Sequence, residues 1–308
     1  MSGPEQLGSV SVLPATLSAE TETRGRPNAA WRGAAMRCLA NPTALFGLVI
    51  LLLVLAAAAI GPFLFPGDPL AMVGRPLQWP GANVRFPLGT DALGRNVLAG
   101  LFHGARISLM VGFSAASVSL FAGTAVGALA GYFGGWVDDL LVKVIEVFQT
   151  IPGFILLIVV VAIAQPSTPA ITLAIGLVSW PSVARLVRAE FRSLKEKEFV
   201  MAARGLGFGH ARIIVREILP NALPAVIVMA SVTVGSAILM ESALSFMGLG
   251  DPNVVSWGSM IGGGREMLRT AWYLSAVPGV AIVLTVLALN LLGDGLNDGL
   301  NPRQRKNR

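Results

Sequence analysis

Residues 44–65 read ALFGLVILLLVLAAAAIGPFLF, an apolar run inside a stretch of 30 uncharged residues between Arg37 and Asp68. A helix rises about 1.5 Å per residue, so about 20 apolar residues suffice to cross the roughly 30 Å of hydrocarbon in a bilayer. A charged side chain in the middle of such a span would be costly, and this run contains none. The run therefore predicts a transmembrane helix over 44–65.

The composition of the whole chain agrees with a membrane protein. Of its 308 residues, 54% are hydrophobic and only 13% are charged, whereas about 25% of the residues of a soluble protein are charged. The single cysteine, Cys38, excludes a disulfide scaffold, and a mean hydropathy of +0.69 excludes a disordered chain. The net charge of +6 is first an orientation signal in such a protein, and we expect no nucleic-acid partner.

Four more gaps between charged residues are long enough to cross a membrane. They lie between Arg106 and Asp138, Glu146 and Arg185, Glu217 and Glu241, and Arg269 and Asp294. The second of these gaps is 38 residues long and is interrupted by QPSTP at 165–169, so it must hold two spans and a turn. We therefore expect six spans, over about 44–65, 107–131, 140–164, 170–188, 222–246 and 274–293.

The distribution of basic residues predicts the orientation. Six spans place both termini on one side, which would hold 17 of the 23 Lys and Arg residues, and the positive-inside rule makes this side cytoplasmic. Residues 1–35 are predicted to be a disordered cytoplasmic tail, 36–304 the transmembrane domain and 305–308 a basic cytoplasmic tail. No cleaved signal peptide is expected, since the first 40 residues lack a short apolar run with a cleavage site.

Two of the predicted loops carry helical patterns. On the external side, DALGRNVLAGLF at 91–102 predicts a short amphipathic helix before the second span. On the cytoplasmic side, residues 195–220 read KEKEFVMAARGLGFGHARIIVREILP, which predicts two short helices, Glu198–Leu206 and Ala211–Leu219, joined by a glycine-rich turn. Such a loop would present Ala202 and Ala203 to the surface of another protein. Spacing alone leaves open that it is simply an amphipathic interfacial loop.

The cytoplasmic loop resembles the EAA loop, with which bacterial ABC-importer permeases dock their ATPase. Ala202-Ala203 is followed after three residues by Gly207, and the loop ends at Leu219-Pro220. Further blocks match in order, namely GTDALGRNVL (89–98), HGARISL (103–109), GYFGGWVDD (131–139), WPSVARLVRAE (180–190), LPNALP (219–224), ESALSFMGLG (241–250) and LALNLLGDGLNDGLNP (287–302). Over roughly 36–304 the chain resembles the C-type permease subunit of the dipeptide/oligopeptide/nickel transport family.

Two positions depart from the pattern of that family. Met201 stands where the motif opens with an acidic residue, and Glu198 lies three residues earlier. Glu217 stands where the family has an apolar residue, two residues before the Leu-Pro pair. These departures concern the docking contacts of the loop.

The resemblance implies an all-α integral membrane protein of the bacterial cytoplasmic (inner) membrane, with six transmembrane helices in a type I ABC importer permease fold. It implies four kinds of partner: a homologous B-type permease subunit, two ABC ATPase subunits or domains, an extracytoplasmic substrate-binding protein and membrane lipid. The ATPase-coupling loop would contain Glu198, Ala202, Ala203, Gly207, Leu219 and Pro220. The expected solute is a short peptide, with nickel or another small solute as the alternative.

The residues predict no enzyme active site and no cofactor in this chain. The sequence has no G-x-x-x-x-G-K-[ST] loop, so ATP and Mg are expected on the partner ATPase subunits. The glycine cluster at 205–209 follows a helical pattern rather than a strand, which argues against a dinucleotide site. His103 and His210 are predicted on opposite sides of the membrane and cannot share a metal. The alternative class, a self-sufficient secondary transporter or channel, would need paired ionisable residues at midspan, and the central thirds of the predicted spans show none.

Overall fold

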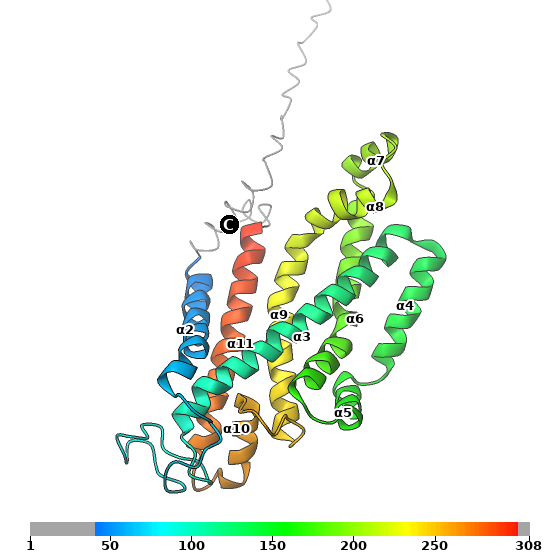
Figure 1. Cartoon of the computed structure of the whole chain (residues 1–308). Coiled ribbons are helices and arrows are strands. Elements are labelled where there is room, and N and C mark those ends of the chain that lie inside the picture. The colour runs from blue at the N-terminus through cyan, green and yellow to red at the C-terminus, as the bar shows by residue number, and fades with distance from the viewer. Residues whose placement is uncertain (1–40, 301–308) are drawn as a thin grey trace, which may run out of the picture.

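The computed structural model describes residues 41–300, and within this range it contains helices and loops but no β-strand (Figure 1). The α-helices are α2 (Pro42–Leu64), α3 (Val97–Phe133), α4 (Gly135–Thr150), α5 (Gly153–Ala164), α6 (Thr168–Lys195), α7 (Glu198–Gly205), α8 (His210–Arg212), α9 (Leu219–Phe246), α10 (Trp257–Gly264) and α11 (Tyr273–Leu300). A π-helix, η1 (Ile213–Ile218), joins α8 to α9, and a 3₁₀ turn, η2 (Arg265–Met267), follows α10. The tails predicted at 1–35 and 305–308 lie outside the described residues.

The long helices run between two ends of the molecule. One end carries the start of α2, the end of α11 and α7, and we name it the α7 end (Figure 1). The opposite end carries α10 and the loop between α2 and α3, and we name it the α10 end. In the described part, α2, α3, α6, the continuous helix α8-η1-α9 and α11 are each long and apolar enough to cross a membrane. A sixth crossing results if α4 and α5 together form one span.

The third predicted span, 140–164, is not one straight helix. It is divided between α4 and α5, whose axes are bent by 81°. Proline disfavours the helical conformation of the residue before it, and Ile151, which precedes Pro152, is extended (φ −88°, ψ 128°). The apolar gap is long enough for a continuous helix, but Pro152 breaks it and turns the chain.

The short helix predicted at 91–102 is likewise not separate from the second span. The side chain of Asn96 accepts hydrogen bonds from the backbone N–H groups of Leu98 and Ala99, and this cap starts a single helix of 37 residues, α3. The charge of Arg106 limits the apolar stretch but does not stop the helix. For the same reason α6 extends beyond the predicted end at 188 to Lys195, and α11 extends beyond 293 to Leu300.

Three glycines spaced four residues apart bring α3 against α6. A Cβ added at Gly123 would lie 2.6 Å from the Cβ of Val183, and one added at Gly131 would lie 2.7 Å from the carbonyl oxygen of Arg188. Gly127, between them, faces the backbone of Ala184 even more closely. Small residues at such spacing allow helices in a membrane to pack backbone to backbone.

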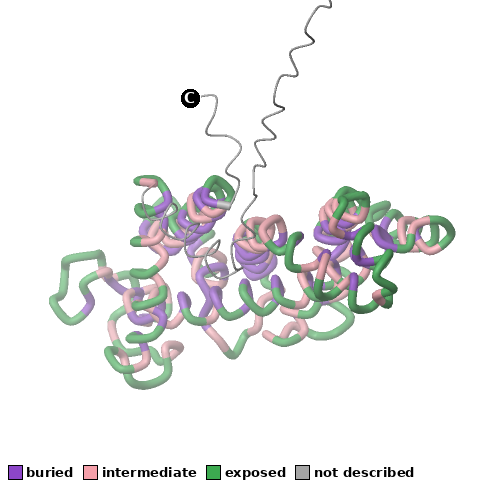
Figure 2. Tube along the Cα trace, turned by 90° about the horizontal axis from the view of Figure 1, so that it is seen from above, coloured by how far each residue is buried: buried purple, intermediate pink, exposed green. Residues whose placement is uncertain are grey.

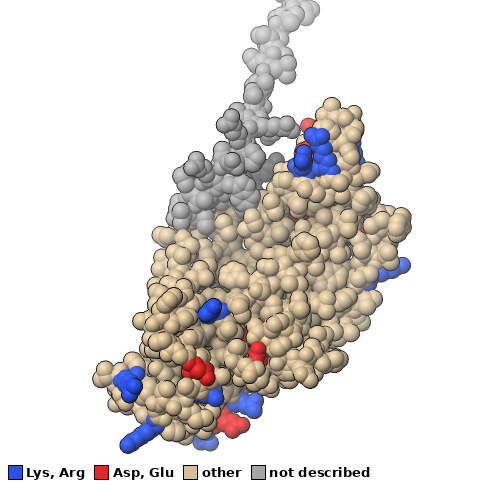
Figure 3. All heavy atoms as spheres, in the orientation of Figure 1, with Lys and Arg blue, Asp and Glu red and all other residues tan. Residues whose placement is uncertain are grey.

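Burial follows the contacts between helices, and the outer faces stay apolar. Buried residues lie between neighbouring helices, whereas residues at the outer edges are mostly exposed (Figure 2). Large apolar side chains are exposed on these outer faces, for example Phe121, which is 81% exposed on α3, and Ile163 on α5. On the face drawn in Figure 3, charged side chains lie mostly toward the two ends. This distribution suits a protein surrounded by lipid between its two ends.

The α10 end is held together by aromatic side chains. The Trp257 Nε1–H group donates to the carbonyl oxygen of Leu101 at 3.0 Å, and its backbone N–H donates to Ser108 Oγ at 3.2 Å, so α10 is attached to α3. The Tyr273 hydroxyl lies 2.9 Å from the carbonyl oxygens of both Gln78 and Thr90, and it attaches the loop between α2 and α3 to α11. These buried donors fix loops that have no regular structure of their own.

The packing of α3 on α6 yields a stability prediction. Replacing Gly127 by leucine places a side chain where the backbone of Ala184 already lies, and overpacking of this kind costs roughly 1–3 kcal/mol. The matched control is Gly279→Leu on α11, since a Cβ at that glycine meets no atom within 4 Å. We expect thermal unfolding of the purified protein in detergent to shift to lower temperature for G127L only. Equal midpoints for both variants would contradict the described contact.

Candidate functional site

The loop that was predicted to couple to an ATPase lies at the α7 end, between α6 and α9 (Figure 1). Its first helix, α7, ends in a glycine turn. The Gly207 N–H donates to the Arg204 carbonyl oxygen at 2.9 Å, and the Phe208 N–H donates to the Ala203 carbonyl oxygen at 3.1 Å. Gly207 has a φ of +76°, a conformation that side chains with a Cβ rarely adopt. This pair of hydrogen bonds is the Schellman motif, and it explains the glycine at 207.

The second helix of the loop differs from the prediction. It does not end at Leu219; instead α8 continues through the π-helix η1 directly into α9. Leu219 and Pro220 are therefore the first two residues of α9. Pro220 has no N–H to donate to the preceding turn, and a wider π turn accommodates this defect within a continuous helix.

The two alanines of the motif differ in exposure, which corrects the expectation that both are offered to a partner. Ala202 is exposed, but Ala203 is only 5% exposed and packs in a cluster with Phe191 of α6 and Ile213 of η1. A different set of residues is exposed on α7 and just after it. We name it the α7 surface, and it consists of Glu198, Met201, Ala202, Gly205 and Leu206.

The α7 surface has a helical pattern. Its members on α7, at 198, 201, 202 and 205, follow the i, i+3, i+4, i+7 spacing of one helix face. Met201 and Leu206 are large exposed apolar side chains, with Leu206 73% exposed. Glu198 carries the only charge among these five residues, and the exposed Arg204, also on α7, carries a second charge beside them. Gly207 is exposed beside it, Pro220 is exposed further along the chain, and Leu219 is half-buried. The surface is therefore small, apolar and open.

Tyr132, in the last turn of α3, attaches the loop to the bundle. Its hydroxyl lies 2.8 Å from His210 Nδ1, and the guanidinium of Arg204 lies 5.6 Å from the centre of its ring, within the range of a cation–π contact. Lys195 Nζ donates to the Tyr132 carbonyl oxygen at 3.4 Å. A buried tyrosine thus joins α3 to α7, to α8 and to the end of α6.

An ion pair that the sequence did not reveal joins α4 to α6. Arg188 donates to both carboxylate oxygens of Asp138, with Nη2 2.7 Å from Oδ2, and Arg192 Nη1 lies 3.7 Å from Oδ2. Asp138 is only 8% exposed. A buried carboxylate without a partner is strongly destabilising, and the two arginines supply the partner charge. The spacing of Arg188 and Arg192, four residues on one helix face, was the available signal. It could not name the partner, since Asp138 lies 50 residues away.

The two histidines contact different parts of the molecule. His103 Nε2 lies 3.1 Å from the carbonyl oxygen of Phe65 near the α10 end, whereas His210 contacts Tyr132 at the α7 end. Among residues 41–300, no three His, Cys, Asp or Glu side chains are placed to hold a metal ion. The two histidines therefore belong to opposite ends of the molecule.

Comparison with known proteins decides the family. Residues 123–306 match the family model described as the binding-protein-dependent transport system inner membrane component. The chain belongs to this family. Residues 30–80 also match the model of the N-terminal transmembrane domain of oligopeptide transport permease C. The chain is thus the membrane component of an ABC importer in the inner membrane, and ATP hydrolysis belongs to separate ATPase subunits.

Curated relatives align with this chain over most of its length. It is 38% identical to the dipeptide transport system permease protein DppC of Alkalihalophilus pseudofirmus over 89% of this chain and 90% of that one. It is 38% identical to the di/tripeptide transport system permease protein DppC of Pseudomonas aeruginosa, over 85% of this chain and 89% of that one. With DppC of Bacillus subtilis the identity is 37% over 98% of this chain and 97% of that one.

A solved structure shows the same fold. The MetNI methionine ABC transporter, in inward-facing conformations, aligns with a TM-score of 0.54 and 18% identity, over 66% of this chain and 96% of that one. The likeness confirms the expected all-α, type I ABC importer permease fold. The number of crossings stays five or six, depending on how the bent pair of α4 and α5 is counted.

Because Ala203 is buried and Ala202 is exposed, the same substitution should destabilise the protein at 203 and have little effect at 202. Ala203→Asp buries a charge without a partner in the cluster beneath α7, which costs on the order of several kcal/mol. Ala202→Asp leaves its charge in solvent and changes stability by about 0.5 kcal/mol or less. Hydrogen exchange of the α7 amides in the purified protein measures the difference. We expect fast exchange for A203D only, and equal protection in both variants would contradict the orientation of α7.

Proposed function

We propose that this chain is one of two permease subunits that form the path of an ATP-driven importer of short peptides, and that α7 couples the path to the ATPases. The observation that carries the proposal is the open, small and apolar α7 surface on a loop packed firmly against α3 and α6. The peptide as solute is supported by relatives that are named as dipeptide and di/tripeptide permeases.

The α7 surface suits insertion of one helix into a groove of another protein. Small residues such as Ala202 and Gly205 permit close approach, and Met201 adapts its shape to the partner. Each residue of the proposed coupling loop then has a role. Glu198 and Ala202 contact the ATPase, Ala203 anchors α7 to the bundle, Gly207 forms the turn, and Leu219 with Pro220 starts the next crossing.

The coupling would act through the contacts beneath α7. Ala203 packs in one cluster with Phe191 of α6 and with Ile213 ahead of α9, and Tyr132 joins α3 to the same loop. A displacement of α7 by the ATPase would therefore move α3, α6 and α9 together. These helices would line the path along with those of the second permease subunit.

The proposed assembly contains a homologous B-type permease, two ABC ATPase subunits or domains that bind ATP and Mg, and an extracytoplasmic substrate-binding protein. The α7 end is assigned to the cytoplasm, and so are both termini. This assignment is supported by the basic residues at that end, which include Arg192, Lys195, Arg204, Arg212 and Arg216. The α10 end would then face the substrate-binding protein.

Transport by the complete complex in vesicles tests the coupling. We expect Ala202→Asp to assemble but to lower peptide uptake and receptor-stimulated ATP hydrolysis by about tenfold or more, because a desolvated, unpaired charge at a contact costs several kcal/mol. Gly207→Val, which strains a left-handed residue by roughly 1–2 kcal/mol, should act in the same direction. Glu196→Gln, exposed just before α7, is the matched control and should transport normally.

Three results would contradict parts of this proposal. Normal uptake by A202D and G207V at matched membrane abundance would remove the loop from the coupling. Uptake of nickel but not of peptides would show that the solute is nickel and not a short peptide. Uptake by this chain alone, driven by a proton or sodium gradient without ATP, would favour a secondary transporter.

The orientation is tested separately by thiol labelling. In a Cys38→Ser background, Val84→Cys places a thiol on a 97% exposed side chain at the α10 end, and Leu206→Cys places one at the α7 end. A membrane-impermeant maleimide should label V84C in intact spheroplasts, and L206C only after permeabilisation. Labelling of L206C before permeabilisation would invert the assignment.

A further inference from the structure

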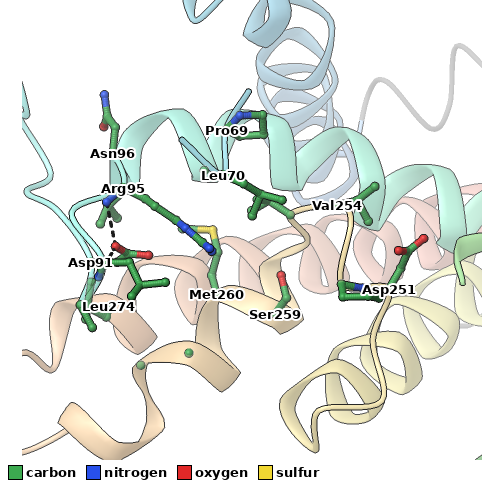
Figure 4. Close-up of a pocket in the computed structure, with 18 residues that line it drawn as sticks. Pro69, Leu70, Asp91, Arg95, Asn96, Asp251, Val254, Ser259, Met260 and Leu274 are labelled. Atoms are coloured by element: carbon green, nitrogen blue, oxygen red, sulfur yellow. Dashed lines mark hydrogen bonds between the residues drawn. The ribbon is translucent and has the colours of Figure 1, made fainter. Parts of the chain in front are cut away.

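A cavity of about 220 Å³ opens at the α10 end, between the loop that precedes α3 and the segment that leads into α10 (Figure 4). Its walls are mostly apolar. They include Leu70, Val97, Val255, Met260 and Leu274. The contacts described for the α7 end do not involve this cavity. It is smaller than the roughly 300–1,000 Å³ of a pocket for a drug-sized ligand, so it suits a small molecule or the end of a larger one.

Arg95 supplies a positive charge inside this apolar cavity. Its backbone N–H donates to Asp91 Oδ1 at 2.8 Å, which holds the residue just ahead of α3, and its side chain extends past Met260 into the cavity (Figure 4). The Nε atom is buried and has no hydrogen-bond partner. Among residues 41–300, no carboxylate lies within 4 Å of the guanidinium nitrogens. A buried donor without a partner is costly, and a guanidinium binds a carboxylate through two parallel hydrogen bonds.

Asp251 supplies a negative charge at another part of the cavity wall (Figure 4). Burial alone would raise the pKa of its carboxyl, but hydrogen bonds from Asn253 and Thr168 outweigh burial and hold the pKa below its ordinary value. Thr168 donates from both N and Oγ1 at 2.8 Å, and Asn253 donates from N at 3.0 Å. The carboxylate is therefore ionised and its oxygens are occupied. It contributes charge to the cavity rather than a further hydrogen bond.

We propose that this cavity is a binding subsite for the carboxyl-terminal end of a short peptide. Arg95 binds the terminal carboxylate, the apolar walls receive the last side chain, and the charge of Asp251 favours a ligand that also carries an ammonium group. The presence of both charges favours a small zwitterion over an acidic side chain of a partner protein, which would meet attraction from Arg95 and repulsion from Asp251. The inference rests on the proposed function for the peptide as solute.

Binding of a defined dipeptide to the assembled complex in lipid nanodiscs, without the substrate-binding protein, tests the subsite. The probes are leucyl-leucine and its C-terminal amide, and ligand-observed NMR titration measures their affinities. We expect the acid to bind at least about tenfold more tightly than the amide, which is the size of one charge-assisted pair. Arg95→Gln should remove this difference, and Arg85→Gln, an exposed arginine of the same loop outside the cavity, should keep it.

A second variant guards against misfolding of R95Q. Leu70→Trp keeps Arg95 but fills the cavity from its half-buried loop wall, and it should weaken both probes. Equal affinities of acid and amide for the wild-type complex would overturn the subsite. A change in affinity for the substrate-binding protein in R95Q, with unchanged dipeptide binding, would also overturn it. Absence of ATP-dependent peptide uptake by the wild-type complex would instead reject the proposed function, so the two failures are distinguishable.

Discussion

The rest of the structure depends on the direct approach of α3 to the backbone of α6, across Gly123, Gly127 and Gly131. Within a membrane, lipid is as apolar as a leucine side chain, so helices associate through close packing rather than through removal of apolar surface from water. The approach of these two helices is possible because no side chain separates them. It places the end of α3 beside the end of α6, where α7 begins.

This arrangement gives the two ends of the molecule different characters. At the α7 end, a short helix is attached to the bundle by a buried cluster and by the contact of Tyr132 with His210, and it leaves an apolar face free. At the α10 end, irregular segments are held by Trp257 and Tyr273 and enclose a cavity with Arg95. The proposed coupling and the proposed peptide subsite therefore lie at opposite ends of one packed unit, as a solute path between two compartments requires.

Much of the fold could be predicted from gaps between charges, because the bilayer imposes the same length on every crossing. The bend at Pro152 escaped this reasoning, since an apolar gap records length and not direction. The orientation of α7 also escaped it: whether Ala202 or Ala203 faces inward depends on Phe191 and other residues of separate helices. The Arg95 cavity combines segments more than 150 residues apart, and no local pattern indicates such a juxtaposition.

If the contacts beneath α7 couple it to the bundle, the loop around α7 and the helix α3 move as one body. Spin labels can be placed in a Cys38→Ser background at Gly209, where a side chain meets no neighbouring atom, and at Phe121 on the exposed face of α3. The distance between them is then measured in the assembled complex by double electron–electron resonance, at rest and with trapped ATP. We expect the same distance distribution in both states. A clear shift of the label at 209 relative to the label at 121 would show that the loop moves independently of α3, which would contradict coupling through these contacts.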